Sequence, residues 1–248
     1  MDTRNIVKIK NKRGSGMIDR TLPNGKWDFD DKVTAVFDDM LERSIPQYNI
    51  MRQAVSSLVQ TFVKDGDNII DIGCSNGIGL GHIVEATNNN CLYTGLEISE
   101  PMLQEAHRRF EGNKNVNIQN ADLRFYNFDT SAKVILSVLT FMFIPIEYRQ
   151  QLLDKCYKAL PEGGALIIVE KILGETGNLN NLYINEYLQM KANNGYSQDE
   201  IDRKRYSLEG VLVPLTAKWN EQLINSAGFR YTDCFWRWMN FAGWIAIK

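Results

Sequence analysis

The chain has few cysteines and few histidines, and both shortages narrow its chemistry. Its 248 residues include four cysteines and two histidines. The cysteines are scattered without a Cys-x-x-Cys pair, so zinc-ligand spacing is absent and a disulfide framework is not expected in a chain of this length. We therefore expect reduced thiols, a cytoplasmic protein and no metal site. His82 and His107 fall in helix-like contexts and are expected to be surface or structural residues.

Long apolar runs and a strong net charge are also missing. No stretch approaches the roughly 18 apolar residues that a membrane span needs, and no apolar segment follows the charged N-terminus as a secretory signal requires. We therefore expect no membrane partner. The formal net charge of −2 gives no general reason to expect a nucleic-acid partner. An apolar content of 44% is typical of a globular protein with a full core.

Basic residues are concentrated at the N-terminus. Residues 1–26 hold seven basic residues against two acidic ones. We expect this segment to be a basic, flexible leader, and contact with a nucleic acid or an acidic partner is its alternative role. Residues 27–248 are expected to form a single domain.

Strand-like and helix-like patterns alternate through the middle of the chain, which predicts a parallel sheet with helices on both faces. The last two apolar runs are close enough to pair as an antiparallel hairpin. The predicted fold is therefore α/β, doubly wound and Rossmann-like, with a mostly parallel seven-stranded sheet and an antiparallel C-terminal hairpin. This is the usual shape of class I methyltransferases. Residues 172–215 are predicted to form a helical lid over the ligand crevice. The expected strands are NIIDIG, CLYTGLEIS, VNIQNADL, KVILSVLTFMFI, ALIIVEKI, RYTDCFWRWMN and FAGWIAIK.

A glycine-rich turn, DIGCSNGIGLG, follows the first expected strand. The dinucleotide fingerprint G-x-G-x-x-G fails here, whether it is started at Gly73 or at Gly77. The turn instead matches acidic-x-Gly-x-Ser-x-Gly, which resembles motif I of S-adenosylmethionine (SAM) methyltransferases. Small residues at these positions let the backbone approach a ligand closely. A purely structural turn is the alternative.

Two acidic residues near later strand ends narrow the choice of ligand. Glu97 ends the second expected strand, where a carboxylate can accept both ribose hydroxyls of SAM or NAD. Asp122 follows the third, where SAM enzymes place an acid against the adenine amino group, although a turn residue is equally consistent. Leu123 would add a backbone N–H and an apolar contact. The turn and the two acids, in this order, predict a SAM-binding domain.

From Trp27 to its C-terminus, the chain resembles the carboxy-S-adenosylmethionine synthase family. Two of the matching segments are specific, because general methyltransferases have no counterpart of them: WDFDDKVTAVFDDMLERSIPQY and KANNGYSQDEIDRKR. The resemblance implies that the chain converts SAM to carboxy-SAM with prephenate as the carboxyl donor. It also implies a homodimer and a role in tRNA wobble-uridine modification.

Motif and resemblance together imply a set of ligand-binding residues. Three of them depart from the family pattern: Glu97 replaces an aspartate, Ile98 an asparagine, and Ser137, or its neighbour Val138, a second asparagine. The whole set, for SAM or carboxy-SAM, is Tyr48, Gly73, Cys74, Ser75, Gly77, Glu97, Ile98, Asp122, Leu123 and Ser137.

Arg205, in DRKRYSLEG, matches the family arginine that binds the extra carboxylate of carboxy-SAM. Ordinary methyl transfer needs no cation beside the positive sulfonium, whereas a guanidinium can clamp a carboxylate in a bidentate manner. A solvated helix residue is the alternative for Arg205.

We therefore expect a SAM-dependent transferase of the carboxy-SAM synthase type, with Arg205 as its catalytic residue. An ordinary SAM-dependent methyltransferase acting on a small molecule or RNA is the main alternative. A SAM-binding module without turnover is a further one, and the failed fingerprint disfavours an NAD oxidoreductase.

Overall fold

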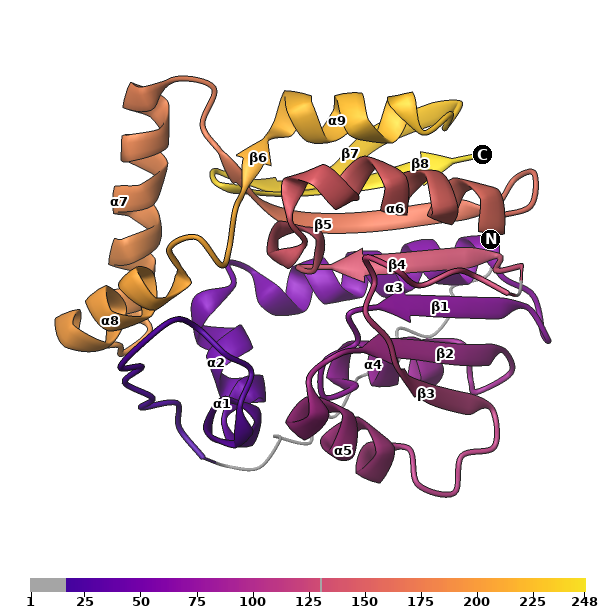
Figure 1. Ribbon diagram of the computed structural model, residues 1–248, viewed down its shortest axis with the longest axis horizontal. Coiled ribbons are helices and arrows are strands. Elements are labelled where there is room, and N and C mark those ends of the chain that lie inside the picture. The colour runs from indigo at the N-terminus through magenta and orange to yellow at the C-terminus, as the bar shows by residue number, and fades with distance from the viewer. Residues whose placement is uncertain (1–16, 130) are drawn as a thin grey trace, which may run out of the picture.

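The computed structural model describes residues 17–129 and 131–248, and a mixed β-sheet lies at its centre (Figure 1). The strand order is β3-β2-β1-β4-β5-β8-β7, with the short β6 paired to β5 outside this order. The α/β fold predicted from the sequence, with its antiparallel C-terminal hairpin, is confirmed. The parallel strands are β1 (Asn68–Ile72), β2 (Leu92–Glu97), β3 (Val116–Asn120), β4 (Val134–Val138), β5 (Ala165–Leu173) and β6 (Leu215–Thr216), and the antiparallel ones are β7 (Tyr231–Trp238) and β8 (Phe241–Ile247).

Helices cover both faces of the sheet. Successive residues of β1 show the cause, because Ile69 belongs to the apolar cluster that contains Val55, while Ile70 belongs to the cluster that contains Leu152. This is the period-two alternation of a strand that is buried on both sides. The covering helices are α3 (Tyr48–Phe62), α4 (Ile78–Ala86) and α5 (Glu100–Arg109) on the first face, and α6 (Ile146–Ala159) and α9 (Ala217–Ser226) on the second.

The segment predicted to be a lid contains two helices that stand beside the sheet near the carboxyl ends of its parallel strands (Figure 1). They are α7 (Gly177–Asn193) and α8 (Gln198–Leu208). A capping box begins α8. The Ser197 side chain accepts a hydrogen bond from the Glu200 backbone N–H, and the Glu200 side chain accepts one from the Ser197 backbone N–H. Three short elements lie at the same end of the sheet: α1 (Asp31–Ala35), α2 (Phe37–Ser44) and the 3-10 helix η1 (Phe141–Phe143).

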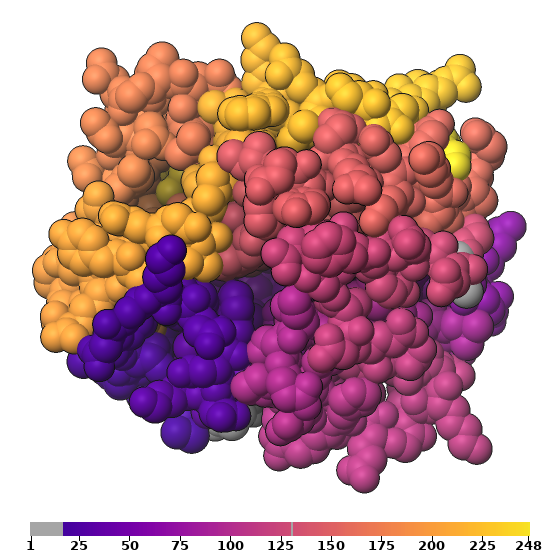
Figure 2. Space-filling model, in the orientation of Figure 1, coloured from indigo at the N-terminus to yellow at the C-terminus, as the bar shows by residue number. Residues whose placement is uncertain are grey.

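Residues 17–26 lie against the lid. Asp19 is fully buried, and the Trp27 amide donates a hydrogen bond of 2.8 Å to the Ser207 carbonyl at the end of α8. Figure 2 shows these N-terminal residues, in indigo, in contact with the orange surface of the lid. The basic leader predicted over residues 1–26 thus includes a segment packed on the domain, while residues 1–16 lie outside the described residues.

Two features are absent from the described residues, a membrane-spanning helix and a cluster of metal ligands. Within residues 17–129 and 131–248, none of the helices combines the length and the apolar character needed to cross a membrane. Over the same ranges, no three His, Cys, Asp or Glu side chains are grouped so as to hold a metal ion. The cysteines Cys74, Cys91, Cys156 and Cys234 are free thiols.

Candidate functional site

The glycine loop after β1 turns sharply against β2 and η1. The amides of Gly73 and Cys74 both donate to the Leu96 carbonyl, which fixes the loop to β2. Gly73 has φ of +74°, and a β-carbon at this position would collide with the Thr140 side chain. Glycine alone meets both conditions at low cost. The absence of a side chain at Gly73, which the motif predicts, therefore lets the loop backbone lie close to Thr140.

The last residue of the loop is under the same steric restriction. Gly77 precedes α4 with φ of +79°, and a β-carbon there would lie 2.7 Å from the Phe110 ring. Ser75, between the two glycines, also has a positive φ of 50°. These left-handed residues turn the chain at the end of β2, where the loop amides of Gly73, Cys74 and Ser75 donate to Leu96 and Glu97.

A cavity beyond the loop, which we name the strand-tip cavity, collects most of the expected ligand-binding residues. It lies where β1, β2, β3 and β4 end, which is the crevice expected of this fold. Phe29 and Pro145 contribute apolar walls. The expected residues that line it are Gly73, Ser75, Glu97, Ile98, Asp122 and Leu123.

Glu97 is held by the backbone around it. Its Oε2 accepts a hydrogen bond from the Ser75 amide at 2.9 Å, and its Oε1 accepts two more from the Ile98 and Ser99 amides at 2.8 and 2.9 Å. A carboxylate offers about four acceptor positions. Little capacity therefore remains for the two ribose hydroxyls expected to bind here, and a ligand that takes both must replace one of these bonds.

Asp122 is paired with a neighbouring arginine. Arg124 donates from Nε to both carboxylate oxygens at 2.9 and 3.0 Å, and its backbone amide reaches Oδ1 at 3.0 Å. The hydrogen bonds from Arg124 hold the pKa of Asp122 below its usual range, so the group stays ionised. The residues that follow β3 therefore present an ion pair with no net charge, Asp122 with Arg124, to the strand-tip cavity.

A second cavity, which we name the inner lid cavity, lies on the lid side of the same loop. It shares Gly73 and Ser75 with the strand-tip cavity, so the loop separates the two. Asp71 and Arg52 both line it. Burial raises the pKa of Asp71 to about 6, and the positive charge of Arg52 opposes that rise. Opposite charges beside the loop suit the ammonium and carboxylate groups of an amino acid.

Other expected residues lie away from direct contact with these cavities. Tyr48 is buried at the start of α3, and its hydroxyl accepts a hydrogen bond of 3.2 Å from Arg52 Nε, so it bears on the inner lid cavity through that arginine. Ser137 is fully buried within β4, and its Oγ has no hydrogen-bond partner in the described chain. The neighbouring Val138 lines the inner lid cavity instead, because successive strand residues face opposite sides.

Arg205 does not line the inner lid cavity. It is exposed on α8 and lines a third cavity, which we name the outer lid cavity. The two lid cavities share Lys171, Tyr187 and Lys191 as a common wall. Lys204, one residue before Arg205, is buried and lines the inner cavity. Because successive helix residues lie about 100° apart, the two cations point to different compartments.

Three lysines in the inner lid cavity escaped the sequence reasoning: Lys171, Lys191 and Lys204. Lys171 and Lys191 have no hydrogen-bond or ion-pair partner among the described residues and lie over aromatic rings, 4.5 Å from the Tyr187 centroid and 5.0 Å from that of Tyr196. Burial lowers the pKa of Lys171 to about 8. Burial, with the charges of Lys204 and Lys171, lowers the pKa of Lys191 to about 7. A lysine within the apolar run ALIIVEKI was the one sequence signal that pointed to Lys171.

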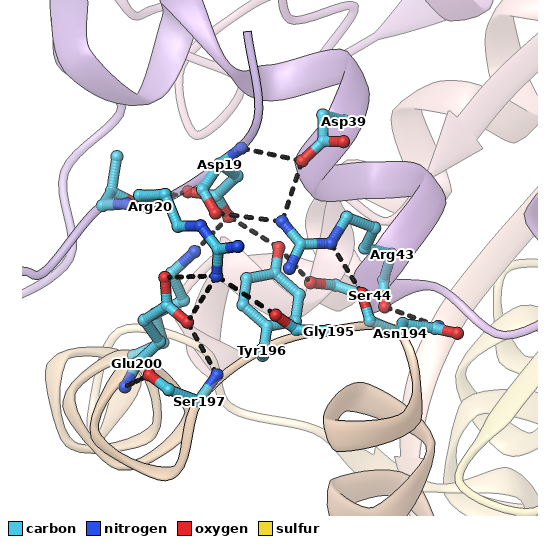
Figure 3. A network of polar contacts seen from close by, with 12 residues as sticks. Asp19, Arg20, Asp39, Arg43, Ser44, Asn194, Gly195, Tyr196, Ser197 and Glu200 are labelled. Carbon is cyan, nitrogen blue, oxygen red and sulfur yellow. Dashed lines mark hydrogen bonds and ion pairs between the residues drawn. The ribbon is translucent and has the colours of Figure 1, made fainter.

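A polar network joins the N-terminal segment to the lid (Figure 3), and Lys204 belongs to this network through its contact with Asp19. Asp19 Oδ2 accepts from Lys204 Nζ and from the Tyr196 hydroxyl, the latter at 2.6 Å. Arg43 donates to the carbonyls of Asp19 and Asn194, at 3.0 and 2.8 Å. Burial raises the pKa of Asp19, but these side-chain hydrogen bonds outweigh it and hold the pKa below its ordinary value. The network therefore fixes the roof of the inner lid cavity.

Comparisons with known proteins assign this architecture to a family. A sequence model described as a methyltransferase domain matches residues 69–164. Proteins named carboxy-S-adenosyl-L-methionine synthase are similar over nearly the whole chain. The one from Methylococcus capsulatus is 37% identical over 89% of this chain and 93% of its own, and the one from Staphylococcus epidermidis is 35% identical over 90% and 97%. The chain belongs to the carboxy-S-adenosyl-L-methionine synthase family.

Solved structures agree with this family at the level of the fold. Human N-acetylserotonin methyltransferase in complex with SAM superimposes with a TM-score of 0.59 and 15% identity, over 88% of this chain and 55% of that one. An O-methyltransferase family protein from Burkholderia thailandensis gives a TM-score of 0.62 and 15% identity, over 88% and 60%. Membership of the carboxy-S-adenosyl-L-methionine synthase family makes the chain a SAM-dependent transferase, and the glycine cradle at Gly73 fits that nucleoside.

Proposed function

We propose that this chain converts SAM to carboxy-SAM, with prephenate as the carboxyl donor. The observation that carries the proposal is the pair of unpaired ammonium groups, Lys171 and Lys191, in the cavity that the glycine loop also lines. A positive sulfonium is repelled by such cations, so they give plain methyl transfer no advantage. A carboxylate attached beside the sulfonium, or carried by a second substrate, is attracted by them.

The proposed exchange balances in atoms and charge. Prephenate loses its ring carboxyl group as CO2 and its ring hydroxide and becomes phenylpyruvate. The hydroxide and one proton of the sulfonium methyl group form water, and the methyl carbon uses the freed electron pair to form a new carbon–carbon bond to the CO2. When bound, SAM supplies a methyl group made acidic by its sulfonium. Asp71 and Arg52 hold the amino-acid end, and the lysines attract the carboxylates. The rings of Phe29 and Phe143, which also line the inner lid cavity, keep it apolar.

The proposal extends to the setting of the reaction. The family resemblance supports a cytoplasmic homodimer whose product serves wobble-uridine modification of tRNA. The basic N-terminal residues remain a candidate for nucleic-acid contact within that role.

A mass spectrum of the nucleosides tests the reaction directly. The purified protein is incubated with SAM and prephenate, and with each alone. We expect a nucleoside heavier than SAM by one carboxyl group in place of a hydrogen, together with phenylpyruvate, only when both substrates are present. Unchanged SAM in all samples would rule out the proposed reaction.

Ordinary methyl transfer is the second candidate, and the exposed position of Arg205 on α8 favours it. The arginine implied by the family resemblance to clamp the product carboxylate does not line the inner lid cavity. The same experiment separates the two reactions when small molecules and RNA are added as acceptors. Accumulation of S-adenosylhomocysteine without carboxy-SAM would select the methyltransferase.

A further inference from the structure

Asn76 occupies a variable position of the glycine loop, between Ser75 and Gly77, yet its side chain is buried. Its Oδ1 accepts a hydrogen bond of 3.2 Å from the Ile78 amide at the start of α4, and its Nδ2 donates one of 2.8 Å to Asp38 Oδ1. Because an N–H group already faces Oδ1, the amide cannot turn over without placing its oxygen against a carboxylate. The Asn76 side chain therefore has one orientation, with its amino group directed at Asp38.

The carboxylate of Asp38 joins three parts of the domain. Asp38 lies in the first turn of α2, where the helix dipole favours a negative charge. Its Oδ1 accepts from Asn76, and its Oδ2 forms an ion pair of 3.5 Å with Arg109, the last residue of α5. Arg109 also donates from Nε to the Asn76 carbonyl at 2.9 Å. Asp38, Asn76 and Arg109 thus form a closed set of contacts that ties α2 and α5 to the loop.

Two other polar side chains of α2 bind the opposite neighbour, the lid and the N-terminal segment. Arg43 donates to the carbonyls of Asp19 and Asn194, and Asp39 accepts from the Asp19 amide at 2.7 Å. In Figure 1, α2 lies between the lid helix α8 and α5. The helix is therefore bonded to the lid on one side and, through Asp38, to the glycine loop on the other.

The space between α2 and the loop belongs to the inner lid cavity. Phe37 and Met40 of α2 line this cavity, and Gly73 lines it from the loop. Asp38 and Asn76 line neither this cavity nor the strand-tip cavity. The pair therefore acts on a bound ligand through the walls that it joins, and walls that are already ordered cost the ligand less binding free energy.

We propose that Asp38 and Asn76 are positioning residues for SAM, and that their hydrogen bond holds the apolar face of α2 at a fixed distance from the glycine loop. Without this bond, the wall that contains Phe37 and Met40 is no longer fixed to the loop, and SAM has to order it at a cost in affinity. The inference concerns the cofactor, which both candidate reactions use. It therefore holds whether the chain transfers a carboxyl or a methyl group.

Exchanging the two side chains tests the pair, because asparagine and aspartate have nearly the same shape and the exchange reverses the hydrogen bond. Asn76→Asp alone sets two carboxylates against each other, whereas the double variant Asp38→Asn, Asn76→Asp restores one donor and one acceptor. Asp38→Asn completes the double-mutant cycle. The start of α4 favours a negative charge at position 76, so Asn76→Asp should fold.

Titration calorimetry with SAM measures the effect. We expect the dissociation constant of SAM to rise about tenfold in Asn76→Asp, as for loss of a hydrogen bond to a charged group, and to return to within about threefold of the wild type in the double variant. Asn113→Asp is the matched control, because Asn113 donates from Nδ2 to Asn89 Oδ1 at 3.1 Å, near the amino ends of β2 and β3. Its dissociation constant should stay within about twofold of the wild type.

The exchange distinguishes a positioning pair from a merely structural one. Losses of affinity that add up in the double variant would overturn the inference, because two residues that act independently have additive effects. An unchanged affinity for SAM in Asn76→Asp, even with a lower free energy of unfolding in urea, would overturn it as well. If Asn76→Asp does not fold, the double variant decides alone: near wild-type affinity supports the pair, and a tenfold loss rejects it.

The proposed reaction can fail separately. Restored SAM affinity in the double variant, with no carboxy-SAM formed by the wild type in the presence of prephenate, would sustain the positioning pair and reject the reaction. Formation of carboxy-SAM by the wild type, with additive losses of SAM affinity in the cycle, would sustain the reaction and reject the pair.

Discussion

The two sides of the cofactor site differ in how their charges are satisfied. At the strand tips, Glu97 accepts three backbone hydrogen bonds and Asp122 is paired with Arg124. On the lid side, Lys171 and Lys191 have no hydrogen-bonding or ionic partner within the part of the chain that the structure describes. A satisfied carboxylate fixes the backbone around it, whereas an unpaired buried ammonium is costly until a ligand pairs it.

The difference indicates a division of labour. The strand-tip side is a scaffold that needs no ligand to hold its shape. The lid side is incomplete by itself, because its unpaired cations await partners. Changes on the first side should therefore act on SAM and on folding, and changes to the unpaired lid cations should act on anions. Lys204 is the exception on the lid side, because it is paired with Asp19 and should therefore contribute to folding.

The largest effect is expected where the lid is tied to the N-terminal segment. Asp19→Ala leaves the buried Lys204 ammonium without its partner, which should lower the free energy of unfolding by about 3–5 kcal/mol. Asp199→Ala removes an exposed pair with Arg203 and should cost less than about 1 kcal/mol. Urea unfolding followed by fluorescence measures both, and equal losses would show that the buried network does not hold the lid.

The same network predicts a direction for pH. The pKa of Asp19 is lower in the folded protein than in the unfolded chain. Its stabilising contribution is therefore complete above the unfolded-state pKa of about 4 and is lost as pH falls through the folded-state value. In Asp19→Ala, this part of the acid destabilisation should be missing from unfolding curves measured between pH 5 and pH 2.

The next effect separates cofactor binding from anion binding. Gly73→Ala places a methyl group against Thr140 at a positive φ and should weaken SAM binding by about 100-fold. Gly112→Ala is its control, since Gly112 also has a positive φ of 78° but open space around it. The comparison, made by calorimetry with SAM, fails if both alanines weaken binding equally.

A smaller effect should appear as the lid lysines lose their charge. The pKa of Lys171 is about 8 and that of Lys191 about 7, so both become neutral as pH rises, while the Tyr187 hydroxyl, its pKa raised by burial, stays protonated. The affinity for prephenate should fall about tenfold from pH 6.5 to pH 9.5. Calorimetry across this range measures it, and a flat profile would exclude the lysines from anion binding.

The smallest effect is expected from a residue that the sequence placed in the site. Ser137→Ala removes an unpartnered buried hydroxyl and should change the free energy of unfolding by less than about 0.5 kcal/mol, with SAM affinity unaffected. Ser99→Ala is the contrast, because the Ser99 hydroxyl caps α5 and its loss should cost about 1 kcal/mol. A marked loss of SAM binding in Ser137→Ala would restore Ser137 to the site.

The sequence was most informative where local chemistry decides the structure. Strand periodicity and the spacing of Gly73, Ser75 and Gly77 depend on backbone sterics, so the sheet, its hairpin and the loop could be predicted. The lid could not be resolved to single residues in the same way. Whether Lys204 or Arg205 faces the inner lid cavity depends on how α8 packs. A family resemblance aligns the sequence of this helix but does not determine its rotation about its own axis. Nothing in the sequence indicated that Lys191 is buried, because no pattern in the residues of α7 distinguishes it from an exposed lysine.

The most direct test of the account compares the affinities of SAM and carboxy-SAM, measured by calorimetry on the wild type and on the double variant Lys171→Met, Lys191→Met. Methionine keeps the apolar contacts of each stem, so the fold should be retained or stabilised. We predict that the wild type binds carboxy-SAM about tenfold or more tightly than SAM, and that the double variant loses this preference while its affinity for SAM holds or rises. An undiminished preference for carboxy-SAM in the double variant would contradict the claim that the unpaired lid lysines receive the anionic group.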